Sequence, residues 1–132
     1  MTKILLALLT LPFIAACAVP ITQDVINSAS FGPEPVEEDY MARINAHFQE
    51  VLIDPESLIL NCFDAVKGWA RRNVLDEPIF GWLVVCDVNG RNAFGGYTGG
   101  KPYAFVFNGT RASVIGPSYL DNQMNQKVGI VD

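Results

Sequence analysis

The sequence predicts an α+β domain in which one N-terminal amphipathic helix packs on an antiparallel sheet of four or five strands. Three observations predict this fold. Apolar residues recur at helical spacing between residues 35 and 53, residues 80–88 are apolar on both faces, and Asn108-Gly109 separates two β-rich runs. A helix with one apolar stripe must bury it, and the strands that follow offer the surface on which it can lie.

The helix is expected from about Pro35 to Ile53. Proline suits the first helical position, and three acidic residues follow at 37–39, where the helix dipole is positive. Asp54-Pro55 ends the helix, because proline restricts the residue before it and cannot continue the hydrogen-bond ladder. The apolar stripe consists of Val36, Tyr40, Ile44, Phe48 and either Val51 or Leu52.

The chain after the helix is expected to form the first strands of the sheet. Residues 57–63 are a short apolar run, and residues 65–73 are a weaker candidate strand. Residues 80–88 are the strongest strand, because β-branched and aromatic residues occupy both faces, as in a central strand that is covered on both sides.

A hairpin is expected near the C-terminus. Residues 103–107 and 110–115 flank Asn108-Gly109, a pair that favours a type I′ turn. Gly116-Pro117 ends the last strand of the domain. The tail, residues 118–132, is polar and has little to bury before its last few residues.

The first sixteen residues are typical of an export signal. Lys3 precedes an apolar run over residues 4–16, which contains Pro12 and is shorter than the roughly 20 residues that a membrane-spanning helix needs. The run ends in Ile14-Ala15-Ala16-Cys17, which resembles the bacterial lipobox. The alternative is an ordinary secretory signal in which Cys17 is incidental.

The lipobox resemblance implies a lipid anchor at Cys17. In such precursors the cysteine thiol receives a diacylglyceryl group, cleavage occurs just before it, and the new amino terminus is acylated. Several acyl chains on one residue give stable membrane attachment. Neither Ala18 nor Val19 is acidic; in Gram-negative lipoproteins an aspartate after the cysteine retains the protein at the inner membrane. The resemblance therefore implies a protein on the outer membrane that faces the periplasm.

The chain divides into four parts: a signal peptide at 1–16, a lipid-anchored tether at 17–34, the domain at 35–117 and the tail at 118–132. The tether is rich in proline and turn residues, so we expect it to hold the domain away from the bilayer. Without the signal about 116 residues remain, enough for one domain. The remaining chain carries about six net negative charges, which argues against nucleic acid or anionic headgroups as partners.

Cys62 and Cys86 are an even pair once Cys17 is used by the anchor. Disulfides persist outside the inner membrane, so the sequence predicts a Cys62–Cys86 bridge. The alternative is that both cysteines are small buried apolar residues. No cysteine–histidine spacing indicates a metal site, and no cofactor is expected.

A glycine-rich segment at 89–103 is the candidate binding loop. Its glycines can take positive φ angles, and its aromatic and polar side chains suit stacking and hydrogen bonding with a peptide or glycan. The alternative is a long bulged connection whose aromatic residues cover one end of the core. The candidate binding residues are Asn92, Phe94, Tyr97, Lys101 and Tyr103.

Residues 36–107 are also similar to a small domain that recurs in uncharacterised bacterial and phage-associated proteins, often lipoproteins. The similarity rests on Asp54-Pro55-Glu56-Ser57 at a helix end, a Val85-Cys86 strand and the run Asn92-Ala93-Phe94-Gly95-Gly96-Tyr97-Thr98-Gly99. Two departures are that Cys86 lies one residue nearer to Val88-Asn89 and that Arg91 replaces the usual lysine. The resemblance implies the fold and carries no established activity.

No arrangement of side chains in the sequence is typical of an active site, so an enzyme is not expected. His47 is the single histidine and lies on the flank of the helix, and no serine has the context of a nucleophile elbow. Asp64 and Asp87 lie near the two cysteines and are a weak acid–base pair. The favoured hypothesis is an envelope lipoprotein that binds a protein or cell-wall partner. The alternatives are an inhibitor or phage or plasmid exclusion lipoprotein, and a degenerate hydrolase.

Overall fold

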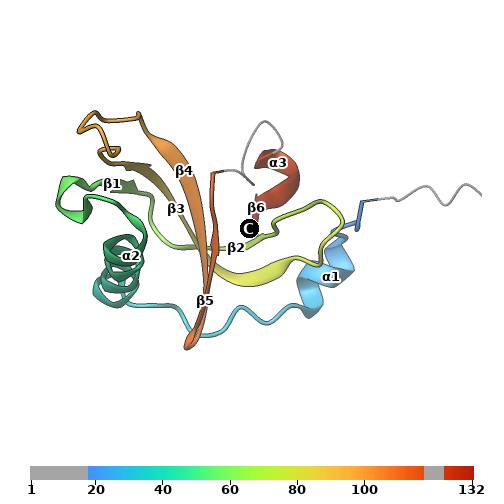
Figure 1. Ribbon diagram of the computed structural model, residues 1–132. Coiled ribbons are helices and arrows are strands. Elements are labelled where there is room, and N and C mark those ends of the chain that lie inside the picture. Colours follow the sequence, from blue (N-terminus) through green and yellow to red (C-terminus); the bar gives the residue numbers. More distant parts are fainter. Residues whose placement is uncertain (1–17, 118–123) are drawn as a thin grey trace, which may run out of the picture.

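The computed structural model describes residues 18–117 and 124–132, so Cys17 and the start of the tail lie outside the described residues. The fold is α+β, with one antiparallel sheet and a helix, α2, packed on one of its faces (Figure 1). The sheet has six strands rather than the predicted four or five. The packing helix is not the first helix either, because a short helix, α1, precedes it.

The helices and strands follow one another along the chain as α1 (Gln23–Ser28), α2 (Glu37–Val51), the 3₁₀ turn η1 (Pro55–Ser57), β1 (Ile59–Cys62), β2 (Val66–Ala70), β3 (Ile79–Asn89), β4 (Lys101–Asn108), β5 (Arg111–Ile115), α3 (Met124–Lys127) and β6 (Val128–Ile130). The strand order is β5-β4-β3-β2-β6, and β1 also pairs with β3. The long strand β3 is central, as its two-sided apolar pattern predicts.

Strands β1 and β2 lie one after the other along the same edge of β3. Cys62 pairs with Cys86, whereas Val66 pairs with Leu83, so three residues on the β1–β2 side lie opposite two on β3. This extra residue is a β-bulge at 63–65. The bulge puts the side chain of Phe63 into solvent, with 73% of its surface exposed.

The middle of the predicted apolar stripe is buried, but its ends are not: Val36 precedes the helix and is 62% exposed, and Val51 is 53% exposed. Tyr40, Ile44 and Phe48 pack against the face of the sheet that is formed by Val84, Cys86, Val88, Phe105 and Phe107. Burial of Tyr40 raises the pKa of its hydroxyl, and the negative charges of Glu37 and Asp64 raise it further. The helix ends at Val51, where the amide of Leu52 donates to the carbonyl of Phe48.

The predicted hairpin is present, but its turn is not type I′. Asn108 pairs with Arg111, so the two central residues are Gly109 and Thr110. Gly109 has φ +59° and Thr110 does not have a positive φ, which fits a type II′ turn with glycine first. Asn108 stays in the strand because its side-chain amide donates to the carbonyls of Ser30 and Phe80.

The predicted tether is packed on the domain over residues 18–34 rather than free of it. The amide of Val19 donates to the carbonyl of Val74, and the Trp82 indole donates to the carbonyl of Gly32. Phe31 packs edge-on against Phe80, with 5.8 Å between ring centroids. These contacts hold the segment against the domain.

The C-terminal tail contributes the sixth strand. Val128, Gly129 and Ile130 pair with β2, so the domain extends beyond residue 117. Arg71, which is buried, joins this strand to the start of the described chain: its guanidinium donates to the carbonyls of Gln126 and Val19. Both ends of the described chain are therefore tied to the end of β2.

The predicted disulfide between Cys62 and Cys86 is present. The two residues lie directly opposite each other in β1 and β3, with 4.0 Å between their Cα atoms. Cys86 is fully buried beneath α2. The bridge holds the short strand β1 to the centre of the sheet.

Candidate functional site

The connection between β3 and β4, residues 90–100, is the candidate binding loop. Residues 91–100 are all exposed to solvent. Figure 1 shows this loop, in orange, at the end of the molecule opposite α1. As the glycine content predicted, Gly95 and Gly99 adopt positive φ angles of 82° and 89°.

The tip of the loop is fixed by Asn92. Its side-chain Oδ1 accepts hydrogen bonds from the amides of Phe94, at 2.9 Å, and Gly96, at 3.1 Å. Its own amide donates to the carbonyl of Gly96, and its carbonyl accepts from the amide of Gly95. An asparagine that bonds its own backbone a few residues on is a common device for closing a turn. The tip is therefore a closed turn held by four hydrogen bonds.

The base of the loop is fixed by Arg91 and Ser57. The amide of Arg91 donates to Ser57 Oγ at 2.8 Å, and that hydroxyl donates to the carbonyl of Asp54 at 2.7 Å. The guanidinium lies 3.7 Å from the Asp54 carboxylate and 5.4 Å from the centre of the Tyr97 ring. The Asp-Pro-x-Ser step after α2 thus supports the first residue of the loop.

An apolar side chain stands fully in solvent on this fixed turn. The Phe94 side chain is 97% exposed, and nothing in the described chain covers it. Beside the loop, the end of α2 exposes Val51 and Ile53, the latter by 74%. A shallow pocket of about 200 Å³ lies between the end of α2 and the base of the loop. We call the residues here the loop surface; all are exposed except Tyr103, which is partly buried: Val51, Ile53, Arg91, Phe94, Tyr97, Lys101 and Tyr103.

The five predicted binding residues have different roles. Phe94, Tyr97 and Lys101 are exposed, but Asn92 uses its side-chain oxygen inside the loop. Tyr103 lines the pocket and packs edge-on against Phe48, with 5.0 Å between ring centroids, so it is part of the core boundary. The two interpretations of the loop therefore each hold in part: Tyr103 covers the edge of the core, whereas Phe94 and Tyr97 are exposed.

Sequence reasoning missed Val51 and Ile53 as members of this surface, and Arg91, which lies inside the predicted loop, was not among the five candidate binding residues. The sequence predicts Val51 as an alternative member of the buried stripe and Ile53 as the last residue of the helix. Asp54-Pro55, which follows these residues directly, could have indicated their exposure. A helix that ends before this pair leaves its last apolar residues beside the next loop.

The three residues considered as catalytic candidates, His47, Asp64 and Asp87, each have other neighbours in the structure. His47 packs edge-on against Phe48 and Phe105, at centroid distances of 5.1 and 5.9 Å. Asp64 lies near Tyr40, whereas the Asp87 carboxylate lies against Gly100, where a Cβ atom would collide with it. Within residues 18–117 and 124–132, no cluster of three or more histidine, cysteine or acidic residues could hold a metal ion.

No helix in the described part of the chain has the length and apolar character needed to cross a bilayer. Comparisons of the chain with models of protein families, with curated proteins and with solved structures found no match.

Proposed function

We propose that this chain is a lipid-anchored protein of the cell envelope whose domain binds a protein partner through the loop surface. The observation that carries the proposal is the fully exposed ring of Phe94 on a turn closed by four hydrogen bonds. A rigid aromatic side chain loses little conformational entropy on binding and buries a large apolar area, which is why aromatic residues dominate binding interfaces.

The pocket at the base of the loop supports a partner that presents an apolar side chain next to an acidic one. Apolar groups of Val51, Leu52 and Ile53 form one wall, and Lys101 supplies positive charge, whereas Arg91 is already paired with the Asp54 carboxylate. Among the described residues no carboxylate lines the pocket, although acidic residues outnumber basic ones in the chain as a whole. Complementary charge of this kind steers a partner to the site.

The position of the loop supports a partner away from the membrane. The described chain starts beside α1, where Val19 is hydrogen-bonded to Val74. The loop lies at the other end of the molecule (Figure 1). An anchor at Cys17 would therefore leave the loop surface pointing away from the bilayer.

The anchor is tested by changing its cysteine. We expect Cys17→Ser to move the protein from the membrane fraction to the soluble envelope fraction and to abolish incorporation of an alkyne-labelled palmitate, because the thiol is the attachment point. Cys62→Ser is the matched control and should keep the label. An unlabelled wild-type protein would refute the anchor without touching the binding proposal.

The binding surface is tested at Phe94. We expect Phe94→Ala to weaken partner binding by 2 kcal/mol or more, about thirtyfold, as for a central aromatic contact. The same change should alter the free energy of unfolding by less than about 0.5 kcal/mol, because the ring packs on nothing.

Site-specific photo-crosslinking in intact cells identifies the partner needed for this measurement. A photoreactive phenylalanine analogue at position 94 should give a discrete protein adduct. The same analogue at position 63, an exposed aromatic position outside the loop surface, is the matched control. Equal adducts from both positions, or adducts with cell-wall glycan alone, would contradict a protein partner at the loop surface.

A further inference from the structure

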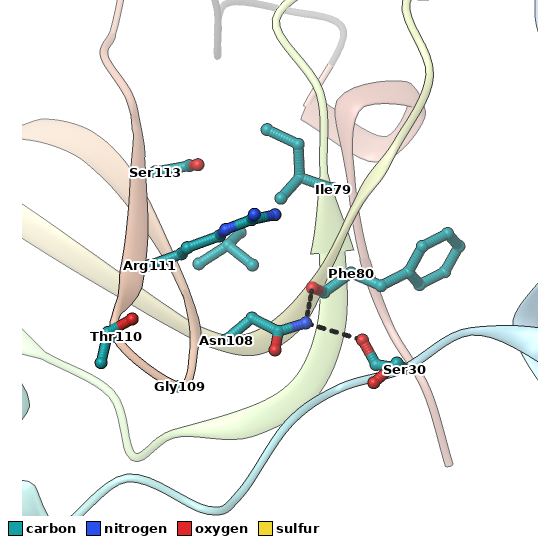
Figure 2. A pocket seen from close by; sticks show the side chains of 9 residues that line it. Ser30, Ile79, Phe80, Asn108, Gly109, Thr110, Arg111 and Ser113 are labelled. Carbon is teal, nitrogen blue, oxygen red and sulfur yellow. Dashed lines mark hydrogen bonds between the residues drawn. The ribbon is translucent and has the colours of Figure 1, made fainter.

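A second pocket lies on the face of the sheet opposite α2. It has a volume of about 690 Å³ and is lined by residues of β3, β4, β5 and the segment at Ser30. Figure 2 shows Arg111 extending from β5 across this pocket toward Ile79, with the hydroxyl of Ser113 on the same side. Its volume lies within the range of pockets that hold small ligands.

The pocket is built by the β4–β5 hairpin. Arg111 and Ser113 are two residues apart on β5, so their side chains lie on the same face of the sheet. They pair across the strands with Asn108 and Val106 of β4, whose side chains share that face. The Asn108 amide donates to the carbonyls of Ser30, at 2.7 Å, and Phe80, at 3.2 Å, as Figure 2 shows. These two bonds hold the pocket wall at Ser30 in place.

The Arg111 side chain is exposed to solvent. Its guanidinium makes no hydrogen bond or ion pair with any residue that the structure describes. By contrast, the nearby Arg43 donates to the carbonyls of Gly109 and Thr110 and stacks on Phe107. No acidic residue from the described part of the chain lines the pocket. The guanidinium is therefore available to pair with an anion that enters the pocket.

We propose that this pocket binds a carboxylate carried at the end of a short apolar chain. The guanidinium would pair with the carboxylate, the hydroxyl of Ser113 would donate to it, and the apolar chain would lie on Ile79 and Val106. A fatty acid and the C-terminus of a peptide that ends in leucine share this chemistry. The site is separate from the loop surface, so the two proposals can fail independently.

The test is an NMR titration of the chain without residues 1–16, followed through the methyl groups of Ile79 and Val106. One arm uses octanoate against 1-octanol, and the other uses a leucine-ending pentapeptide with a free or an amidated C-terminus. We expect saturable shifts with at least one of the two carboxylates and much weaker shifts with its uncharged counterpart. The arm that responds identifies the source of the carboxylate.

Arg111→Gln should weaken the observed binding about tenfold or more, as expected for loss of a charge-assisted hydrogen bond. Arg72→Gln, which changes an exposed arginine outside the pocket, is the matched control and should leave binding unchanged. The proposal is overturned if neither carboxylate shifts these methyl groups, if octanol binds as well as octanoate, or if both variants bind like the wild type.

Discussion

Phe48→Ala should lower the free energy of unfolding by about 4 kcal/mol, the largest effect expected from any single substitution in α2. The Phe48 side chain has 0% exposure, and its ring packs edge-on against Tyr103 and Phe105. Truncation removes these contacts and leaves a cavity between the helix and the sheet. Urea unfolding that is followed by tryptophan fluorescence measures the loss.

Two controls make the Phe48 result specific. Phe48→Leu keeps most of the apolar volume, so it should cost about 1.5 kcal/mol or less. Phe94→Ala removes the same ring from solvent and should cost almost nothing. A loss below about 1 kcal/mol for Phe48→Ala would mean that α2 does not cover the sheet as described.

The long, strongly patterned elements could be predicted from the sequence. Tyr40, Ile44 and Phe48 recur at helical spacing because one face of α2 is buried. The sequence pattern therefore indicates directly which side of the helix packs on the sheet. The strand β3 is apolar on both faces for a similar reason: Val84 and Cys86 are buried under α2, and Leu83 is buried on the other face. The pairing of Cys62 with Cys86 followed from their number.

The short elements could not be predicted, because tertiary contacts rather than local pattern hold them. The strand β6 has three residues, one of them Gly129, and it exists because it pairs with β2. The helix α1 buries none of its residues, so it has no apolar stripe to read. The bulge at 63–65 is a difference in register between two strand pairs, which no single strand's sequence records.

The candidate site was predicted in part for the same reason. The glycines and the exposed aromatic ring of Phe94 were visible as composition. The support from Ser57 was not, because the hydrogen bond to the amide of Arg91 joins residues 34 positions apart. This bond connects the loop to the start of β1, and β1 is the strand that the disulfide holds.

Loss of the Cys62–Cys86 bridge should therefore weaken both the fold and the loop. In the chain-entropy account a bridge that closes a loop of about 25 residues contributes about 3 kcal/mol, so the double variant Cys62→Ala, Cys86→Ala should lose about that much unfolding free energy. Reduction of the wild type with a phosphine should give a similar loss and should leave the double variant unchanged, which is the control.

Hydrogen exchange on the same samples should locate the change. The strand β1 is short, and the structure pairs it with β3 alone, so its amides should lose protection first. The amide of Arg91 should follow, because its acceptor, Ser57 Oγ, lies two residues before β1. Amides shared by β4 and β5 lie on the other side of β3 and should keep most of their protection under native conditions. If all strands lost protection equally, the bridge would stabilise only the whole fold, and the loop would not depend on β1. A loss of protection confined to β1 and the loop would instead mean that the exposed turn that carries Phe94 depends on an oxidising environment.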